Sequence, residues 1–151
     1  MSFAKSLSIA DEMEREINKE ARALTINLWN GLTRVNPVGN PDLWVYNHPT
    51  RGYIDYVGYF GQPDYVGGRS RSNWFVSMGL PSRKTTDETL PASSRQSLGS
   101  AIARAKNTKY PLMIVSNNMD YIEKLNDGSS TQAPKKFIES EIDRVVNASN
   151  K

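Results

Sequence analysis

The pattern of apolar positions predicts a long amphipathic helix in the first part of the chain. Apolar side chains recur at spacings of three and four, at Ile9, Met13, Ile17, Ala21, Leu24, Leu28 and Leu32. This spacing places them on one face of a helix that spans about residues 8–32. Ser8 followed by Asp11 is typical of a capping box at its start. Asn30 and Gly31 indicate a stop or a fray point near its end.

The helical period is lost between residues 36 and 68, where prolines and glycines are interleaved with half of the aromatic residues of the chain. One interpretation is a long ordered loop or hairpin that packs on its own domain, with short strands within residues 53–60. The other is a docking arm whose rings anchor on a partner, because Tyr and Trp are enriched at interface hot spots. Long loops in compact domains are usually functional, which favours the arm. Its expected contact residues are Tyr53, Tyr56, Tyr59 and Phe60.

The second half of the chain predicts a mixture of strands and helices. Alternation at Trp74, Val76 and Met78 predicts a strand that ends before Pro81. A helix is expected from Ser93 or Ser94 to about residue 106, a buried strand at 112–115, a helical turn or irregular strand at 120–125, and a final helix whose first position is Pro134. The elements lack a regular βαβ rhythm. The predicted fold class is therefore α+β, with a long N-terminal helix, a small and mostly antiparallel sheet, a C-terminal helix and a long aromatic, Gly- and Pro-rich insertion.

The composition fits one globular domain. The chain has 151 residues, of which 38% are hydrophobic and 23% charged, so we expect a single domain over residues 1–151 with 39–66 as an inserted loop or arm. The lack of cysteine excludes a disulfide scaffold. The N-terminal segment is charged and the longest apolar run, residues 110–115, is too short to span a bilayer. We therefore expect synthesis in the cytoplasm and no membrane partner.

The charge is distributed unevenly along the chain. Residues 1–66 hold 6 basic and 8 acidic side chains, whereas residues 67–109 hold 8 basic and 2 acidic ones. The basic segment could face nucleic acid or an acidic protein surface, or be a solvated face. At its start, the run from Gly67 to Arg71 could form an anion-binding nest, or the two glycines could provide only a turn into the strand.

The residue types that catalysis requires are scarce in this chain. His48 is the only histidine, and no nucleophile motif accompanies it. One histidine and no cysteine leave only carboxylates for a metal, and the acidic residues at 11–20 are expected mostly on the solvated or partner-facing side of the first helix. No nucleotide-binding loop is present. We therefore expect neither enzymatic activity, nor a metal, nor a cofactor.

Two segments carry a resemblance to a known family. The first is Arg69-Ser70-Arg71-Ser72-Asn73-Trp74-Phe75-Val76-Ser77, followed by Gly79 and Pro81. The second runs from Ser116-Asn117-Asn118 through Tyr121 and Gly128 to Gln132-Ala133-Pro134, and its Gln-Ala-Pro sequence is the most specific part. Together they resemble neck or tail-completion proteins of tailed bacteriophages, the lambda-type minor tail protein Z group. The chain departs from the family pattern after Asn36-Pro37-Val38-Gly39, where residues 40–66 replace the usual Asp- and Thr-containing turn.

The resemblance implies a structural virion protein of the phage neck that takes part in head-tail joining. It would form a ring, a hexamer or a dodecamer, between the portal or head-tail adaptor protein and the tail terminator or tail-tube protein, with genomic DNA passing through the lumen. Its location would be the virion, and the host cytoplasm during assembly. Arg69 and Arg71 would make inter-subunit or DNA-facing contacts. The residues implied to shape the family fold are Gly68, Asn73, Trp74, Asn117, Tyr121, Gly128, Gln132, Ala133 and Pro134. A nucleic-acid-binding accessory module that uses the basic residues 67–109 is the alternative.

Overall fold

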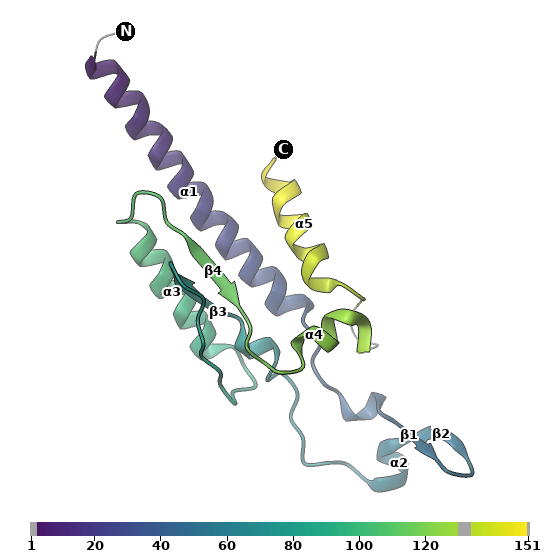
Figure 1. Ribbon diagram of the computed structural model, residues 1–151. Coiled ribbons are helices and arrows are strands. Elements are labelled where there is room, and N and C mark those ends of the chain that lie inside the picture. The colour runs from purple at the N-terminus through teal and green to yellow at the C-terminus, as the bar shows by residue number, and fades with distance from the viewer. Residues whose placement is uncertain (1–2, 130–133, 151) are drawn as a thin grey trace.

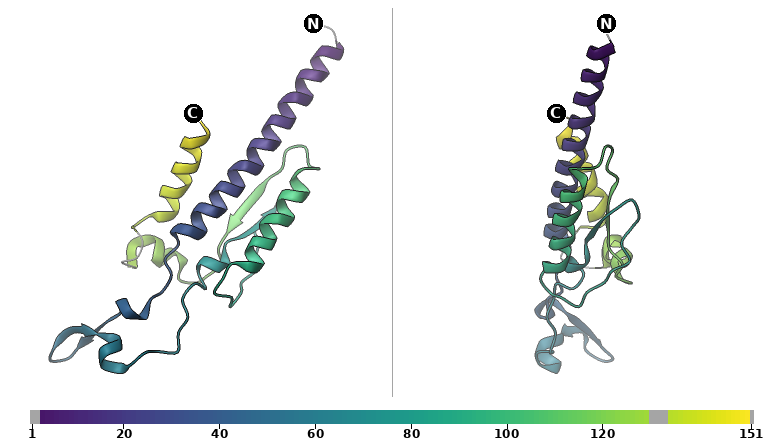
Figure 2. Two further views of the ribbon diagram at one scale, coloured as in Figure 1. Left: turned by 180° about the vertical axis from the view of Figure 1, so that it is seen from behind. Right: turned by 90° about the vertical axis from the view of Figure 1, so that its left-hand side faces the viewer.

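The computed structural model describes residues 3–129 and 134–150 and has the predicted α+β architecture (Figure 1). Helix α1 (Phe3–Val35) is the longest of the described helices, and helix α5 (Phe137–Ser149) packs along one side of it. Strand β3 (Phe75–Met78) packs on helix α3 (Ala92–Ala105), and strand β4 (Met113–Ser116) packs on α1. Seen edge-on, the body is a thin slab, with α1 reaching far beyond it at one end (Figure 2).

The described strands form two separate antiparallel pairs. In the body, β3 pairs with β4 in a register that joins Phe75 to Ser116 and Met78 to Met113. In the insertion, β1 (Val45–His48) pairs with β2 (Gly52–Asp55). The sheet is thus as small and antiparallel as the sequence predicts, but it is divided between the body and the insertion.

The insertion projects from the body as an arm at the end opposite the N-terminus (Figure 1). After α1 it contains a 3₁₀ turn (Pro41–Leu43), the β1–β2 hairpin and the short helix α2 (Tyr56–Phe60). The prediction of strands within residues 53–60 is therefore correct for residues 53–55, which belong to β2, and wrong for residues 56–60, which form α2. Asp55 ends the strand and caps α2, since its carboxylate accepts a hydrogen bond from the Gly58 amide.

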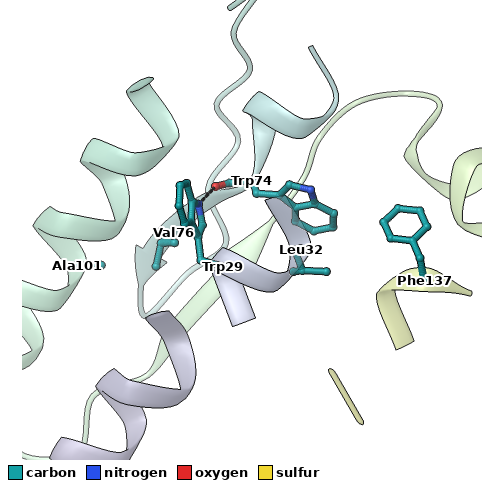
Figure 3. Packing of buried hydrophobic residues seen from close by; sticks show 6 residues of the cluster. All are labelled: Trp29, Leu32, Trp74, Val76, Ala101 and Phe137. Carbon is teal, nitrogen blue, oxygen red and sulfur yellow. Dashed lines mark hydrogen bonds between the residues drawn. The ribbon is translucent and has the colours of Figure 1, made fainter. Parts of the chain in front are cut away.

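The core lies where α1, β3, α3 and the start of α5 meet. Trp29, Leu32, Trp74, Val76, Ala101 and Phe137 are buried there (Figure 3). The Trp29 indole donates a hydrogen bond of 2.8 Å to the Trp74 carbonyl, so this bulky residue is buried without an unpaired donor. Trp74 lies just before the strand that it was expected to open, because its carbonyl faces α1 and not β4.

The boundaries of α1 differ from the predicted ones at both ends. The helix already includes Phe3, so Ser8 and Asp11 lie inside it and do not form a capping box. It also continues through Gly31 to Val35. Gly31 is explained by packing: a Cβ atom there would overlap the carboxylate of Glu141, which α5 presses against this turn. The glycine permits a close approach between helices and does not end one.

The final helix also starts later than predicted. Pro134 is not its first residue, because α5 begins at Phe137 after Lys136, whose φ of 61° is left-handed and incompatible with a helix. Asn126 takes over the capping: its side-chain oxygen accepts from the Ile138 amide at 3.0 Å and its amide group donates to the Glu139 carboxylate. These hydrogen bonds lower the pKa of Glu139.

Candidate assembly interface

The turn before β3 is held by a buried polar network and is not an open anion-binding loop. It contains a single 3₁₀ turn, Arg71–Asn73. Asn73 is fully buried and uses its whole amide: it donates to the Arg69 and Thr86 carbonyls at 2.6 and 2.9 Å, and it accepts from the Thr86 amide at 2.8 Å. Gly68 precedes the turn with a φ of 111°, and a Cβ atom there would overlap the Thr89 carbonyl oxygen. The turn therefore binds the chain's own residues 86–89.

A second set of hydrogen bonds ties this turn to the end of α1. Asn36 accepts from the Trp74 indole at 2.9 Å and donates to the Ser70 hydroxyl at 3.1 Å. Asn117, which follows β4, donates to the Ser70 carbonyl at 2.9 Å. Three segments that are distant in sequence thus meet at Ser70. The sequence placed Asn36 at the start of a turn but did not predict its burial, because an asparagine before a proline gives no signal of burial.

Arg69 and Arg71 contact residues of their own chain. Arg69 forms an ion pair of 2.9 Å with Asp87, which is almost fully exposed, and Arg71 donates to the Thr89 carbonyl at 3.3 Å. Exposed ion pairs contribute little to stability. Both arginines contact residues 86–89, and about half of the Arg69 side chain still faces solvent.

Three more residues implied by the resemblance, Tyr121, Gly128 and Pro134, lie in the segment between β4 and α5. Tyr121 precedes helix α4 (Ile122–Lys124), and its partial burial raises the pKa of the phenol, opposed by the positive charge of Arg69. Gly128 has a φ of 98° and breaks the π-helical turn Leu125–Ser129. Pro134 is exposed ahead of α5. Gln132 and Ala133 lie outside the described residues.

The arm is organised by its own aromatic rings. Tyr46 stacks on Tyr59 with ring centroids 5.6 Å apart and meets the edge of Phe60 at 4.8 Å. Tyr56 joins this cluster through Phe60 and Trp44. Such pairs stabilise a fold beyond the burial of area alone. The cluster explains how so short a hairpin holds its shape away from the body.

Three of the four expected contact residues of the arm are exposed, and the fourth, Tyr56, is half-buried. Tyr59 and Phe60 are about half exposed, and Tyr53, which takes part in no ring pair among the described residues, is 75% exposed. His48 lies in this cluster: its ring lies against Tyr59, and its Nδ1 accepts from the backbone amides of residues 50 and 51. Within the described ranges no group of three potential metal ligands occurs.

A third surface was missed at the level of the sequence. The first positions of the apolar stripe on α1, Ile9, Met13 and Ile17, are exposed. The N-terminal end of this helix extends past the body (Figure 2). The helical period gave the face correctly but could not indicate that the described part of the chain covers these three side chains only in part. Ile142 and Val146 on α5 are similarly exposed.

Comparison of the chain with protein-family models, with curated proteins and with solved structures finds no match. No described helix has the combination of length and apolar character needed to cross a membrane.

Proposed function

We propose that this chain is a structural component of a tailed-phage neck, which assembles into a ring and joins the head to the tail. The observation that carries an assembly role is the aromatic arm, which projects from the body and holds Tyr53, Tyr59 and Phe60 at its surface. The resemblance of the two motif segments directs this role to the neck. In the ring, neighbours would be other copies, the portal or head-tail adaptor, and the tail terminator or tail-tube protein.

The architecture of the arm supports a docking role in preference to a simple loop. Its two ends run together at Gly39 and Gly67, where a Cβ atom on Gly67 would overlap the Gly39 carbonyl oxygen. The arm is therefore connected to the body by a narrow stalk but is preordered by its aromatic cluster. A preordered arm loses less conformational entropy when it docks than a disordered one does. Exposed tyrosines on such an arm are suited to anchor in the surface of a neighbour.

The placement of Arg69 and Arg71 gives less support to direct contact with DNA. Their guanidinium groups bind carbonyls and a carboxylate of residues 86–89, which already use part of their donors. A role as a nucleic-acid-binding module would predict tight and steeply salt-dependent DNA binding by the isolated chain. Weak or absent binding at moderate salt is the outcome we expect.

The proposed function is tested in a phage that encodes this chain. Deletion should leave DNA-filled heads and separate tails, both visible by electron microscopy, and the wild-type chain supplied in trans should restore joined particles. Tyr53→Ala should restore them poorly, because this ring supports no other ring of the arm and is available for docking. Leu90→Ala, a similarly exposed position on the body, is the matched control. Normal joining of heads and tails without the protein would refute the proposal.

A further inference from the structure

An apolar groove runs along α1 between α5 and β4. It has a volume of about 180 Å³, and its floor is made by Leu24 and Leu28 of α1. Met113 and Val115 of β4 line one wall, and Ile142 and Val146 of α5 line the other. Ile142 and Val146 are 41% and 46% exposed, and Leu112, which precedes Met113 in the chain, is 61% exposed. Apolar side chains of three different elements thus converge on a site that faces solvent.

The exposed N-terminal part of α1 continues the floor of this groove. We call residues 9–17 the overhang, because they precede Asn18, whose side chain donates to the carbonyl of Ala105 at the end of α3. The N-terminal end of α1 extends past α3 and α5 (Figure 1). Leu24 follows Ile17 by seven residues and Leu28 follows it by eleven, which are close to whole numbers of helical turns. Groove and overhang therefore form one continuous apolar face, on which Met13 is 60% exposed.

The charges beside the two parts of this face are complementary. Residues 9–20 hold five acidic and two basic side chains, so the overhang and the turn that follows it carry a net charge of −3. The segment that leads into β4, residues 104–112, holds Arg104, Lys106 and Lys109 and no acidic residue, a net charge of +3. All three of these basic residues are exposed. Lys106 and Lys109 line a cavity with the charged residues of their own α1, five basic and two acidic side chains in all (Glu14, Arg15, Glu16, Lys19, Arg22, Lys106 and Lys109). This edge therefore stays basic, and a second acidic overhang that reached it would be attracted to it.

We propose that the groove binds the overhang of a second copy of this chain. The apolar side chains of Ile9, Met13 and Ile17 pack on those that line the groove. The acidic side chains beside them lie near the basic residues of the segment that leads into β4. A helix suits this site because it can pack on α1 between α5 and β4, as helices ordinarily pack on one another. Each copy carries both an overhang and a groove, so the contact can propagate around a closed assembly.

This inference deepens the proposed function and rests on it for the expectation that the assembly closes into a ring. Neighbouring copies would then touch through the overhang of one and the groove of the next. The arm is then left for contacts with other neck components. The two ends of the protomer would thereby have different partners.

The chain contains no cysteine, so disulfide trapping tests the contact without a background. One sample mixes a Met13→Cys chain with an Ile142→Cys chain under mild oxidation. The control mixes Arg15→Cys with Ile142→Cys, because residue 15 is also exposed but lies on nearly the opposite side of the overhang. Disulfides form only between Cβ atoms that approach closely, so we expect the first pair to give at least about tenfold more mixed dimer.

Equal yields from both mixtures would overturn the proposal, as would a Met13→Cys chain that couples mainly to itself, since overhangs would then pair with each other. As a second measurement, Met13→Glu with Ile17→Glu should lower the mass determined by light scattering to that of the monomer while the helical circular dichroism is unchanged. An unchanged oligomer would also overturn it. A chain that associates through the overhang but is dispensable for head-tail joining would instead refute only the proposed function.

Discussion

Gly31 and Glu141 provide a sharp test of how α5 is seated on α1. Gly31 lies inside α1, where alanine is ordinarily more stable than glycine by about 1 kcal/mol. In this structure a Cβ atom at residue 31 would overlap the Glu141 carboxylate and lie 2.8 Å from its Cγ. Glu141 is 5% exposed and is held by Arg144 and Arg34, so its side chain has little room to move. We therefore expect Gly31→Ala to destabilise the protein.

The magnitude follows from two opposing effects. Adding a methyl group to a packed site costs about 1–3 kcal/mol, and the upper half of that range applies because the overlap involves several atoms of one side chain. Helix propensity returns about 1 kcal/mol. The free energy of unfolding should thus fall by about 1–2 kcal/mol. In a Glu141→Ala background the obstruction is gone, and the same Gly31→Ala change should raise it by about 0.5–1 kcal/mol.

The assay is equilibrium unfolding in urea, followed by circular dichroism at one protein concentration for the wild type, both single variants and the double variant. The sign of the Gly31→Ala effect should reverse between backgrounds, with a coupling energy of about 2 kcal/mol. A Gly31→Ala change that stabilises both backgrounds equally would refute the reasoning. It would mean that α5 does not press Glu141 against this turn.

Three further predictions concern other parts of the chain. Asn73→Ala should lower the free energy of unfolding by about 2–4 kcal/mol in urea titrations, because three hydrogen bonds are lost at a buried site; a loss below about 1 kcal/mol would contradict the network. The Glu88 carboxylate accepts hydrogen bonds from the Ser93 hydroxyl and amide, and these lower the pKa of Glu88. The ionised carboxylate therefore stabilises the fold at every pH above the pKa that Glu88 has in the unfolded chain. This stabilisation is lost as the pH falls through the lower pKa of the folded state. Glu88→Gln should therefore lower the melting temperature at pH 7 but not in strong acid; a difference that does not depend on pH would argue against this. Tyr46→Ala should speed amide exchange in the arm and leave exchange in α3 unchanged, since Tyr46 contacts Tyr59 and Phe60; slow exchange in the arm would show that the cluster does not hold it.

The elements with a strong period could be predicted from the sequence, whereas their boundaries could not. The apolar stripe from Ile9 to Leu32 gave α1 because helix geometry alone decides which side chains share a face. The continuation of α1 past Gly31 depends on a neighbour, because the deciding contact there is Glu141, which is more than a hundred residues away in the chain. The late start of α5 similarly depends on Asn126, whose capping role has no local signal.

The candidate surfaces show the same division. The abundance of aromatics predicted an arm with exposed rings, but the ring pairs that order it, such as Tyr46 with Tyr59, are tertiary contacts. Sequence likewise marked Arg69 and Arg71 as charged without indicating that the carbonyls of residues 86 and 89 lie within reach. Charge is a property of the residue, but its partner is a property of the fold.

The stripe on α1 extends this argument from folding to assembly. A period of apolar residues predicts that a helix face will be buried, but it carries no information on whether the covering surface belongs to the same chain. At Leu32 the cover is the core, and at Ile17, 47% exposed, the described part of the chain supplies none that is complete. Both residues belong to one uninterrupted pattern. Burying exposed apolar side chains is favourable whichever molecule covers them, so the continuity of the stripe past the edge of the body is itself a physical reason to expect a second molecule there.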